Sequence, residues 1–204
     1  MSTNLSKSKS DASTRRLTGL SMLTAIVAVL TVLGTFIRFG PFTITLSLAP
    51  IVVGAALYGP SAGAILGTVF GVVVLLTGIA GWDGGTVMLL LGISPVALVL
   101  VCVLKGTGAG WVSGLVYRAI SKHNEKLAVL VAGILCPVTN TGLFIIGMLL
   151  FFTSTLESWA SGQGVLYYII FGLTGINFLV ELAINIILSS GITAIIKYTK
   201  GRKH

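Results

Sequence analysis

Six long apolar segments alternate with short polar connections along the 204 residues of the chain. A helix of about 20 apolar residues is long enough to cross the hydrocarbon core of a bilayer. The pattern therefore predicts an all-α membrane protein, a compact bundle of six transmembrane helices. The segments cover approximately residues 17–37, 42–58, 60–80, 94–120, 126–152 and 166–197.

The polar stretches between and around these segments set the expected organisation of the chain. Residues 1–16 are Ser-rich and polar, and we expect them to be a disordered cytoplasmic N-terminus. Residues 17–198 form the six-helix transmembrane domain, and residues 199–204 a basic cytoplasmic tail. A weaker apolar piece at 86–93 predicts a short interfacial helix, and Pro137 predicts a bend in the fifth transmembrane helix.

Composition supports the membrane assignment and narrows the function. The chain is 55% hydrophobic and 9% charged, whereas soluble domains carry about 25% charged residues. The net charge of +8 does not indicate nucleic acid binding, because the cations lie at the ends of apolar segments. Cys102 and Cys136 lie inside apolar runs, so we expect two small buried side chains and neither a disulfide nor a metal site.

The distribution of cations predicts the orientation in the membrane. With the N-terminus inside, only Arg38 falls outside, together with Asp83 and Glu157. An excess of Lys and Arg marks cytoplasmic loops, so both termini are expected in the cytoplasm. The inner cations are Lys7, Lys9, Arg15, Arg16, Arg118, Lys122, Lys126, Lys197, Lys200, Arg202 and Lys203.

Four polar side chains interrupt the apolar segments at one depth. At ~1.5 Å per residue, Lys105, Asn140, Asn177 and Glu181 lie about 15 to 22 Å from the outer ends of three helices. Charged groups at this depth are costly when they face lipid and usually mark functional sites. The sequence therefore predicts a ligand site here. The alternative is a buried Lys105–Glu181 ion pair, with the Asn side chains holding helices together.

Small residues recur at helical spacing in three segments. Gly63, Gly67 and Gly71 form one series, and a second series runs along the segment that carries Lys105. Both series predict close helix packing within the bundle. In the first segment, similar spacings offer a surface for another helix at Ser21, Thr24, Ala25 and Ala28.

Sequence motifs for catalysis are absent. The chain has no GxxxxGK[ST] phosphate-binding loop and no HExxH zinc motif. His123 and His204 lie in polar flanks, and no Ser/His/Asp set shares one depth. We therefore expect no enzyme activity, no cofactor and no metal.

Two stretches resemble one known family. FGPFTITLSLAPIVVGAALYGPSAGAILGTVFG at 39–71 is similar to the second and third helices of the substrate-binding S components of energy-coupling factor (ECF) vitamin transporters. KGTGAGWVSGLVYRAI at 105–120 is similar to the fourth helix of that family, and the likeness extends over nearly the whole chain after residue 16.

The resemblance implies a multi-pass subunit of a bacterial cell membrane that captures a vitamin outside with high affinity. Its expected partners are a transmembrane coupling subunit and two cytoplasmic ATPases, which drive release of substrate inside. The family docks through an Ala-x-x-x-Ala motif, which corresponds here to Ser21 and Ala25, or to Thr24 and Ala28. The implied substrate-binding residues are Lys105, Asn140, Asn177 and Glu181, with Arg38 and Trp82 as lids.

Within the family the chain most resembles the pantothenate-specific branch, through PFTITLSLAPIVVGA and KGT. A substrate carboxylate would pair with Lys105 or Arg38, which suits pantothenate and equally biotin or another small carboxylate, and disfavours the cation thiamine. Two other classes stay open. One is a stand-alone secondary transporter with Glu181 as its proton site, and the other is a membrane assembly protein with a purely structural polar face.

Overall fold

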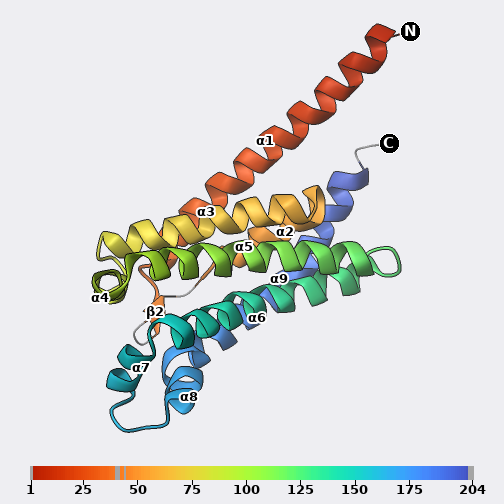
Figure 1. The fold of residues 1–204 in the computed structure, drawn as a ribbon. Coiled ribbons are helices and arrows are strands. Elements are labelled where there is room, and N and C mark those ends of the chain that lie inside the picture. The colour runs from red at the N-terminus through yellow and green to blue at the C-terminus, as the bar shows by residue number, and fades with distance from the viewer. Residues whose placement is uncertain (1, 40–41, 44, 202–204) are drawn as a thin grey trace.

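The structure is a computed structural model that describes the backbone of residues 2–39, 42–43 and 45–201. At some of these positions, Arg38 among them, only the backbone is described. The described part of the chain is almost entirely helical (Figure 1). Its elements are α1 (Ser2–Gly34), β1 (Arg38–Phe39), β2 (Phe42–Thr43), α2 (Leu48–Tyr58), α3 (Pro60–Ile79), α4 (Thr86–Ile93), α5 (Pro95–Ile120), α6 (Glu125–Phe151), α7 (Thr153–Ala160), α8 (Val165–Tyr167), the π-helix η1 (Tyr168–Thr174) and α9 (Gly175–Gly201).

Five helices are long and apolar enough to cross a membrane. The spans lie at Ser13–Gly34, Pro60–Ile79, Pro95–Ile120, Glu125–Phe151 and Asn177–Ile196. The second predicted segment is different, because its helix α2 has only 11 residues and so measures ~16 Å. The all-helical fold class is confirmed, with five long spans and one shorter apolar helix among the described residues.

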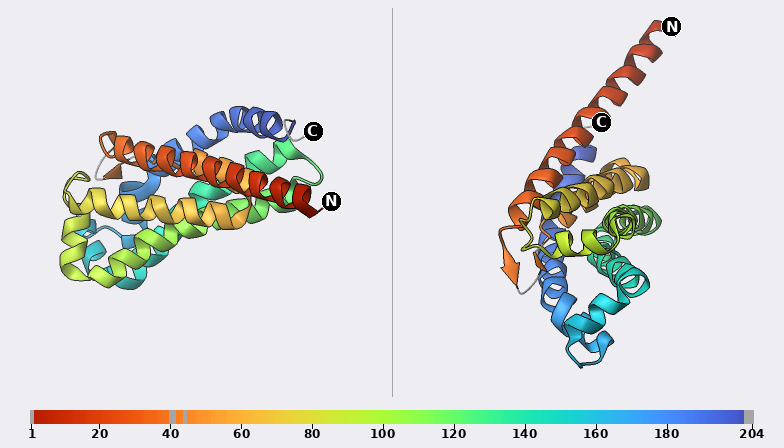
Figure 2. Two further views of the ribbon diagram at one scale, coloured as in Figure 1. Left: turned by 90° about the horizontal axis from the view of Figure 1, so that it is seen from above. Right: turned by 60° about the vertical axis from the view of Figure 1, so that its left-hand side comes forward.

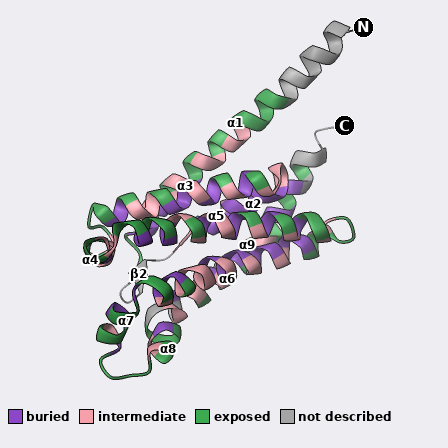
Figure 3. Ribbon diagram, viewed as in Figure 1, coloured by how far each residue is buried: buried purple, intermediate pink, exposed green. Residues whose placement is uncertain are grey.

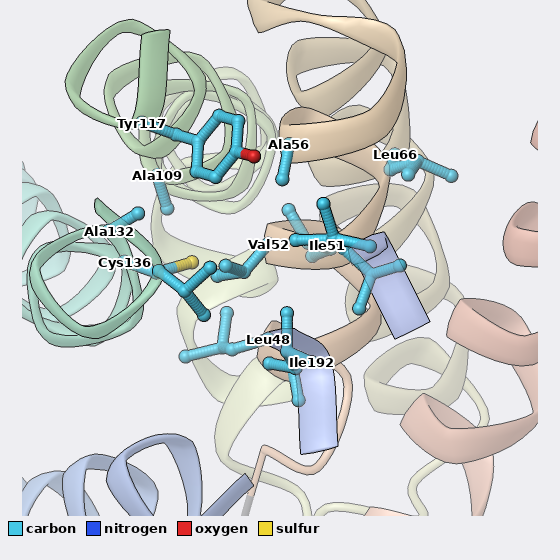
Figure 4. Close-up of a cluster of buried hydrophobic side chains, with 14 of the residues drawn as sticks. Leu48, Ile51, Val52, Ala56, Leu66, Ala109, Tyr117, Ala132, Cys136 and Ile192 are labelled. Atoms are coloured by element: carbon cyan, nitrogen blue, oxygen red, sulfur yellow. The ribbon is translucent and has the colours of Figure 1, made fainter. Parts of the chain in front are cut away.

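The short helix α2 lies at the centre of the bundle. Leu48, Ile51 and Val52 are fully shielded from solvent, as expected for a helix that is apolar on all sides. Figure 4 shows these side chains facing residues of the surrounding helices, including Ala109 on α5 and Cys136 on α6. This cluster occupies the half of the bundle nearer the chain ends. It includes Leu66 near the start of α3 and Tyr117 near the end of α5, and both of these helix ends lie in that half.

The two glycine series lie in close helix contacts within the bundle, as the sequence predicted, and the structure shows that they pack against each other. A Cβ atom at Gly67 would collide with the carbonyl oxygen of Gly106, and one at Gly106 would collide with that of Gly67. Gly63 and Gly110 face each other in the same way. Bare glycine backbones let α3 and α5 approach closely. A hydrogen bond between the hydroxyls of Thr68 and Thr107, 2.7 Å long, adds a polar contact across the same interface.

Both described chain ends lie at the same end of the bundle as the turn between α5 and α6 (Figure 2). At this end Arg16 on α1 donates a 3.3 Å hydrogen bond to the backbone carbonyl of Tyr58, where α2 ends. The outer surface of α1 is largely exposed (Figure 3). The opposite end carries the β1–β2 hairpin, α4 and α7 (Figure 1).

Several local predictions differ from the structure. Residues 2–16 form the first turns of α1, where the sequence predicted disorder; once a helix is formed, each further residue adds one hydrogen bond at low cost. The last predicted helix is divided into α8, η1 and α9, and α7 occupies the connection 153–165.

Other local predictions agree with the structure. The bounds of α5 and α6 match the prediction closely, and α4 confirms the short helix. Of the predicted basic tail, residues 202–204 lie outside the described part.

Candidate functional site

A cavity of about 120 Å³ lies in the half of the bundle away from the chain ends. Its wall comes from the last turns of α1, the second half of α3, the first half of α5, the second half of α6, the beginning of α9, and α4. One water-sized group needs roughly 10–15 Å³ by this measure, so the cavity holds about ten such groups. This space suits a small organic molecule better than a single ion.

Four of the six predicted substrate-binding residues line this cavity together. Lys105 comes from α5, Asn140 from α6, and Asn177 and Glu181 from α9. Asn177 and Glu181, four residues apart, lie on one face of α9, and Thr174 at the end of η1 lines the cavity with them. The structure therefore brings these side chains to one place, as the sequence predicted from their depth.

The ammonium group of Lys105 lies against aromatic rings. Its Nζ atom is 5.1 Å from the ring centroid of Phe144 and 5.8 Å from that of Phe70. The negative faces of aromatic rings attract a cation at these distances. Within the described part of the chain, Lys105 forms no ion pair with Glu181. A carboxylate entering the cavity would therefore meet a cation that lacks a close anionic partner among the described residues.

Glu181 has a different partner. Its side chain is 5% exposed, and its Oε1 atom accepts a 3.2 Å hydrogen bond from the backbone N–H of Thr45. Thr45 lies between β2 and α2 and itself lines the cavity. The contact joins α9 to the connection between the first two apolar helices. The alternative of a Lys105–Glu181 ion pair is therefore not the arrangement seen in this structure.

The two cavity asparagines each have a buried atom without a hydrogen bond. Asn140 and Asn177 are 5% and 8% exposed, and the Oδ1 atom of each has no partner within the described residues. A buried polar atom without a partner is costly and in native proteins usually bonds to water or a ligand. The amides of Asn140 on α6 and Asn177 on α9 can therefore form hydrogen bonds with a bound molecule.

Of the two predicted lid residues, only Trp82 has a described side chain, and it does not line the cavity. Trp82 is 44% exposed, and its ring packs 5.9 Å from that of Phe36 at the end of α1. The side chain of Arg38 lies outside the described residues. The described ring contact of Trp82 is therefore with the chain that follows α1 and not with a ligand in the cavity.

Asp83, beside Trp82, lines the cavity and was not predicted. Its two carboxylate oxygens accept hydrogen bonds from the backbone N–H groups of Gly85, at 3.0 Å, and Val87, at 2.7 Å. Asp83 thereby fixes the turn that leads into the first residues of α4. The sequence offered a signal in Asp83-Gly84-Gly85, which is typical of a turn, but it gave no indication that the turn folds over the site.

Threonine side chains make up much of the remaining polar wall, and most of them were not predicted from the sequence. Thr31 and Thr77 lie on α1 and α3, Thr35 lies in the turn that follows α1, and each donates its hydroxyl to a backbone carbonyl three or four residues before it. Their oxygens keep the capacity to accept further hydrogen bonds. Threonine is common in apolar helices, so no pattern in the sequence separates these positions from others.

The four predicted docking residues of α1 divide into two pairs. Ser21 and Ala25 are exposed, whereas Thr24 and Ala28 are half-buried. The Thr24 hydroxyl bonds to the carbonyl of Leu20 at 2.8 Å within the helix. Of the two spacings considered from the sequence, only Ser21 and Ala25 therefore present small side chains to the outside of the bundle.

The described residues include no group of three or more His, Cys, Asp or Glu side chains that could hold a metal ion. Both cysteines are free and buried, in accord with the sequence. The candidate site is thus a partly open cavity of a size for an organic ligand, with one ammonium, two carboxylates that accept hydrogen bonds from backbone N–H groups, and amide groups with unbonded atoms.

The family model described as "ECF transporter, substrate-specific component" matches residues 15–196. The chain belongs to this family. Its members are subunits of membrane transporters and not enzymes, so the protein is the substrate-specific component of an ECF transporter, which works with an ECF coupling module. The resemblance found in the sequence is confirmed at the level of the family. A comparison with curated proteins gave no match.

Proposed function

We propose that this ECF component is the high-affinity binding subunit of an ATP-driven importer for a small carboxylate vitamin, pantothenate first and biotin second. The observation that carries the proposal is the Lys105 ammonium in the wall of the cavity, against aromatic rings and without an ion pair to Glu181. A charge-assisted hydrogen bond to a carboxylate is about twice as strong as one between neutral groups, and low local polarity strengthens it further.

The rest of the cavity supports a substrate that also carries amide or hydroxyl groups. Asn140 and Asn177 both line the cavity, and the Oδ1 atom of each lacks a hydrogen-bond partner among the described residues, so both amides can exchange hydrogen bonds with such groups. Pantothenate has a carboxylate, an amide and two hydroxyls, and biotin has a carboxylate and a cyclic urea. Either molecule matches a wall with one cation and several neutral polar groups.

We further propose six transmembrane segments, with α2 and the chain leading into it as the second, and both termini in the cytoplasm. Arg118 and Lys122 lie at the same end of the bundle as the two described chain ends. The opposite end, nearer the cavity, carries Asp83 and Glu157. The positive-inside rule then places the cavity in the outer half of the membrane, where it collects substrate from outside.

Movement of substrate to the inside is proposed to require a transmembrane coupling subunit and two ATPases supplied by other chains. The exposed pair Ser21 and Ala25 on α1 is the proposed contact with the coupling subunit, because small side chains permit close helix approach. The shared cavity of Lys105, Asn140, Asn177 and Glu181 favours this function over a purely structural polar face.

Binding by the isolated chain tests the proposal. The chain is purified in detergent without other subunits and titrated calorimetrically with pantothenate, biotin and thiamine. We expect tight binding of one of the two carboxylates and none of thiamine. Binding of thiamine, or of no carboxylate vitamin in a folded sample, would contradict the proposed function.

A further inference from the structure

Glu181 lies in the cavity wall, yet its described hydrogen bond is not directed at the space where a ligand would sit. Its Oε1 atom accepts from the backbone N–H of Thr45, at 3.2 Å, across 136 positions of sequence. The side chain is 5% exposed. A buried carboxylate that accepts a backbone N–H fixes the position of that backbone, because losing the bond leaves both groups without a partner.

The same short connection is tied on its other side to α1. The hydroxyls of Ser47 and Thr31 share a 2.6 Å hydrogen bond, and Ser47 also donates to the carbonyl of Val27 at 3.3 Å. Ser47 is completely buried and Thr31 is 5% exposed. The connection therefore has one anchor on α1 and another, Glu181, on α9.

Thr31, Thr45 and Glu181 all line the cavity. The two anchors therefore determine where one side of the cavity wall stands. If the anchor on α9 is lost, the described side-chain hydrogen bonds hold the connection through Ser47 alone, and the wall can move away from Lys105 and the asparagines. The site would then lose its shape even though every proposed ligand-contacting group remained present.

We propose that Glu181 is a positioning residue, which holds the backbone of Thr45 as a wall of the site and does not act as a charged partner of the substrate. This assignment rests on the proposed function and gives a specific role to one residue of that same cavity. It requires the length and the acceptor oxygen of the Glu181 side chain, whereas its negative charge is secondary.

Two substitutions separate reach from charge. Glu181→Gln keeps the length and an acceptor oxygen but removes the charge, and Glu181→Asp keeps the charge but is one methylene shorter. If Glu181 positions Thr45, the Gln variant weakens binding of radiolabelled pantothenate or biotin by no more than about threefold. The Asp variant should weaken it by about ten- to a hundredfold, because the N–H of Thr45 and the shortened side chain would each be left without a partner.

Hydrogen exchange in the empty protein provides a readout that does not depend on the vitamin. Resolved to the backbone amide of Thr45, exchange should be at least tenfold faster in Glu181→Asp than in the wild type and near wild type in Glu181→Gln. Thr193→Val is the matched control, because Thr193 lies on the same helix and its hydroxyl bonds only to the carbonyl of Ser189 within α9. It should change neither measurement.

The outcomes distinguish this inference from the proposed function. Equal Thr45 exchange in the wild type and the Asp variant overturns the positioning role, whatever the protein binds. Weaker binding in Gln than in Asp also overturns it, since charge would then matter more than reach. If the exchange results agree with positioning while the wild type binds no carboxylate vitamin, the proposed function fails and the role of Glu181 in shaping the cavity stands.

Discussion

The ammonium nitrogen of Lys105 lies 5.1 Å from the centre of the Phe144 ring. This contact joins α5 to α6 inside the cavity, and the Phe70 ring on α3 lies at 5.8 Å from the same nitrogen. A desolvated cation gains up to ~2 kcal/mol from such a ring. The aromatic rings therefore explain how an ammonium can be kept at membrane depth while the cavity is empty.

This contact predicts a coupling between the two side chains. Phe144→Leu should lower the free energy of unfolding of the empty protein by more in the wild type than in a Lys105→Met background, by about 1–2 kcal/mol. Phe144→Tyr, which keeps the ring, should show little of this difference. Denaturation of the detergent-purified variants measures it, and equal losses in both backgrounds would show that the ring contributes packing alone.

The glycine interface between α3 and α5 gives a stability prediction with an internal control. Gly67→Ala would place a methyl group against the carbonyl oxygen of Gly106 and should destabilise the fold by about 1–3 kcal/mol. Gly142→Ala on α6 has no atom within 4 Å of its added Cβ, and should be neutral or slightly stabilising. Thermal unfolding of the two variants compares them. Equal melting temperatures would contradict the close contact of α3 and α5.

The proposed orientation can be tested by labelling cysteines in intact cells. We choose two exposed positions for substitution by cysteine. Glu157 lies at the end of the bundle that carries α7, and Lys122 lies in the turn between α5 and α6. The natural cysteines are buried and should give little background. We expect an impermeant maleimide to label position 157 without permeabilisation and position 122 only after it. The reverse pattern would place the termini outside.

Docking through α1 predicts a separation of binding from uptake. Ala25→Trp should abolish uptake by cells that contain the coupling module, because a large side chain prevents close helix approach. Ligand affinity of the isolated chain should change by less than about threefold, since Ala25 is exposed and faces away from the bundle. Ile187→Trp, on an exposed position of α9, is the control and should keep both. Loss of affinity in Ala25→Trp would mean that this face belongs to the fold.

The residues at membrane depth were predictable because physics constrains them strongly. A cation or an amide inside an apolar segment must face the interior, and the depth of Lys105, Asn140, Asn177 and Glu181 along three helices predicted that they lie at one level. The glycine series were predictable for a similar reason, since bare strips at four-residue spacing mark close packing.

The connections between helices were less accessible from the sequence. Asp83 looked like an outer loop residue, and its place in the cavity follows from how the chain turns after α3. The hydrogen bond between Thr45 and Glu181 is donated by a backbone N–H. Every residue but proline carries this group, so no pattern of side chains in the sequence predicts the bond. The partner of Lys105 was also missed, because Phe144 and Phe70 look like ordinary apolar residues of their segments.

The most direct test of the proposed function compares two ligands that differ only in the charged group. Pantothenate and its analogue with a primary alcohol in place of the carboxylate are titrated into the wild type and into Lys105→Ala. If Lys105 binds the carboxylate, the substitution weakens pantothenate by about ten- to a hundredfold and changes the affinity for the alcohol by less than about threefold. Equal losses for the two ligands would show that Lys105 maintains the bundle and does not bind the substrate carboxylate.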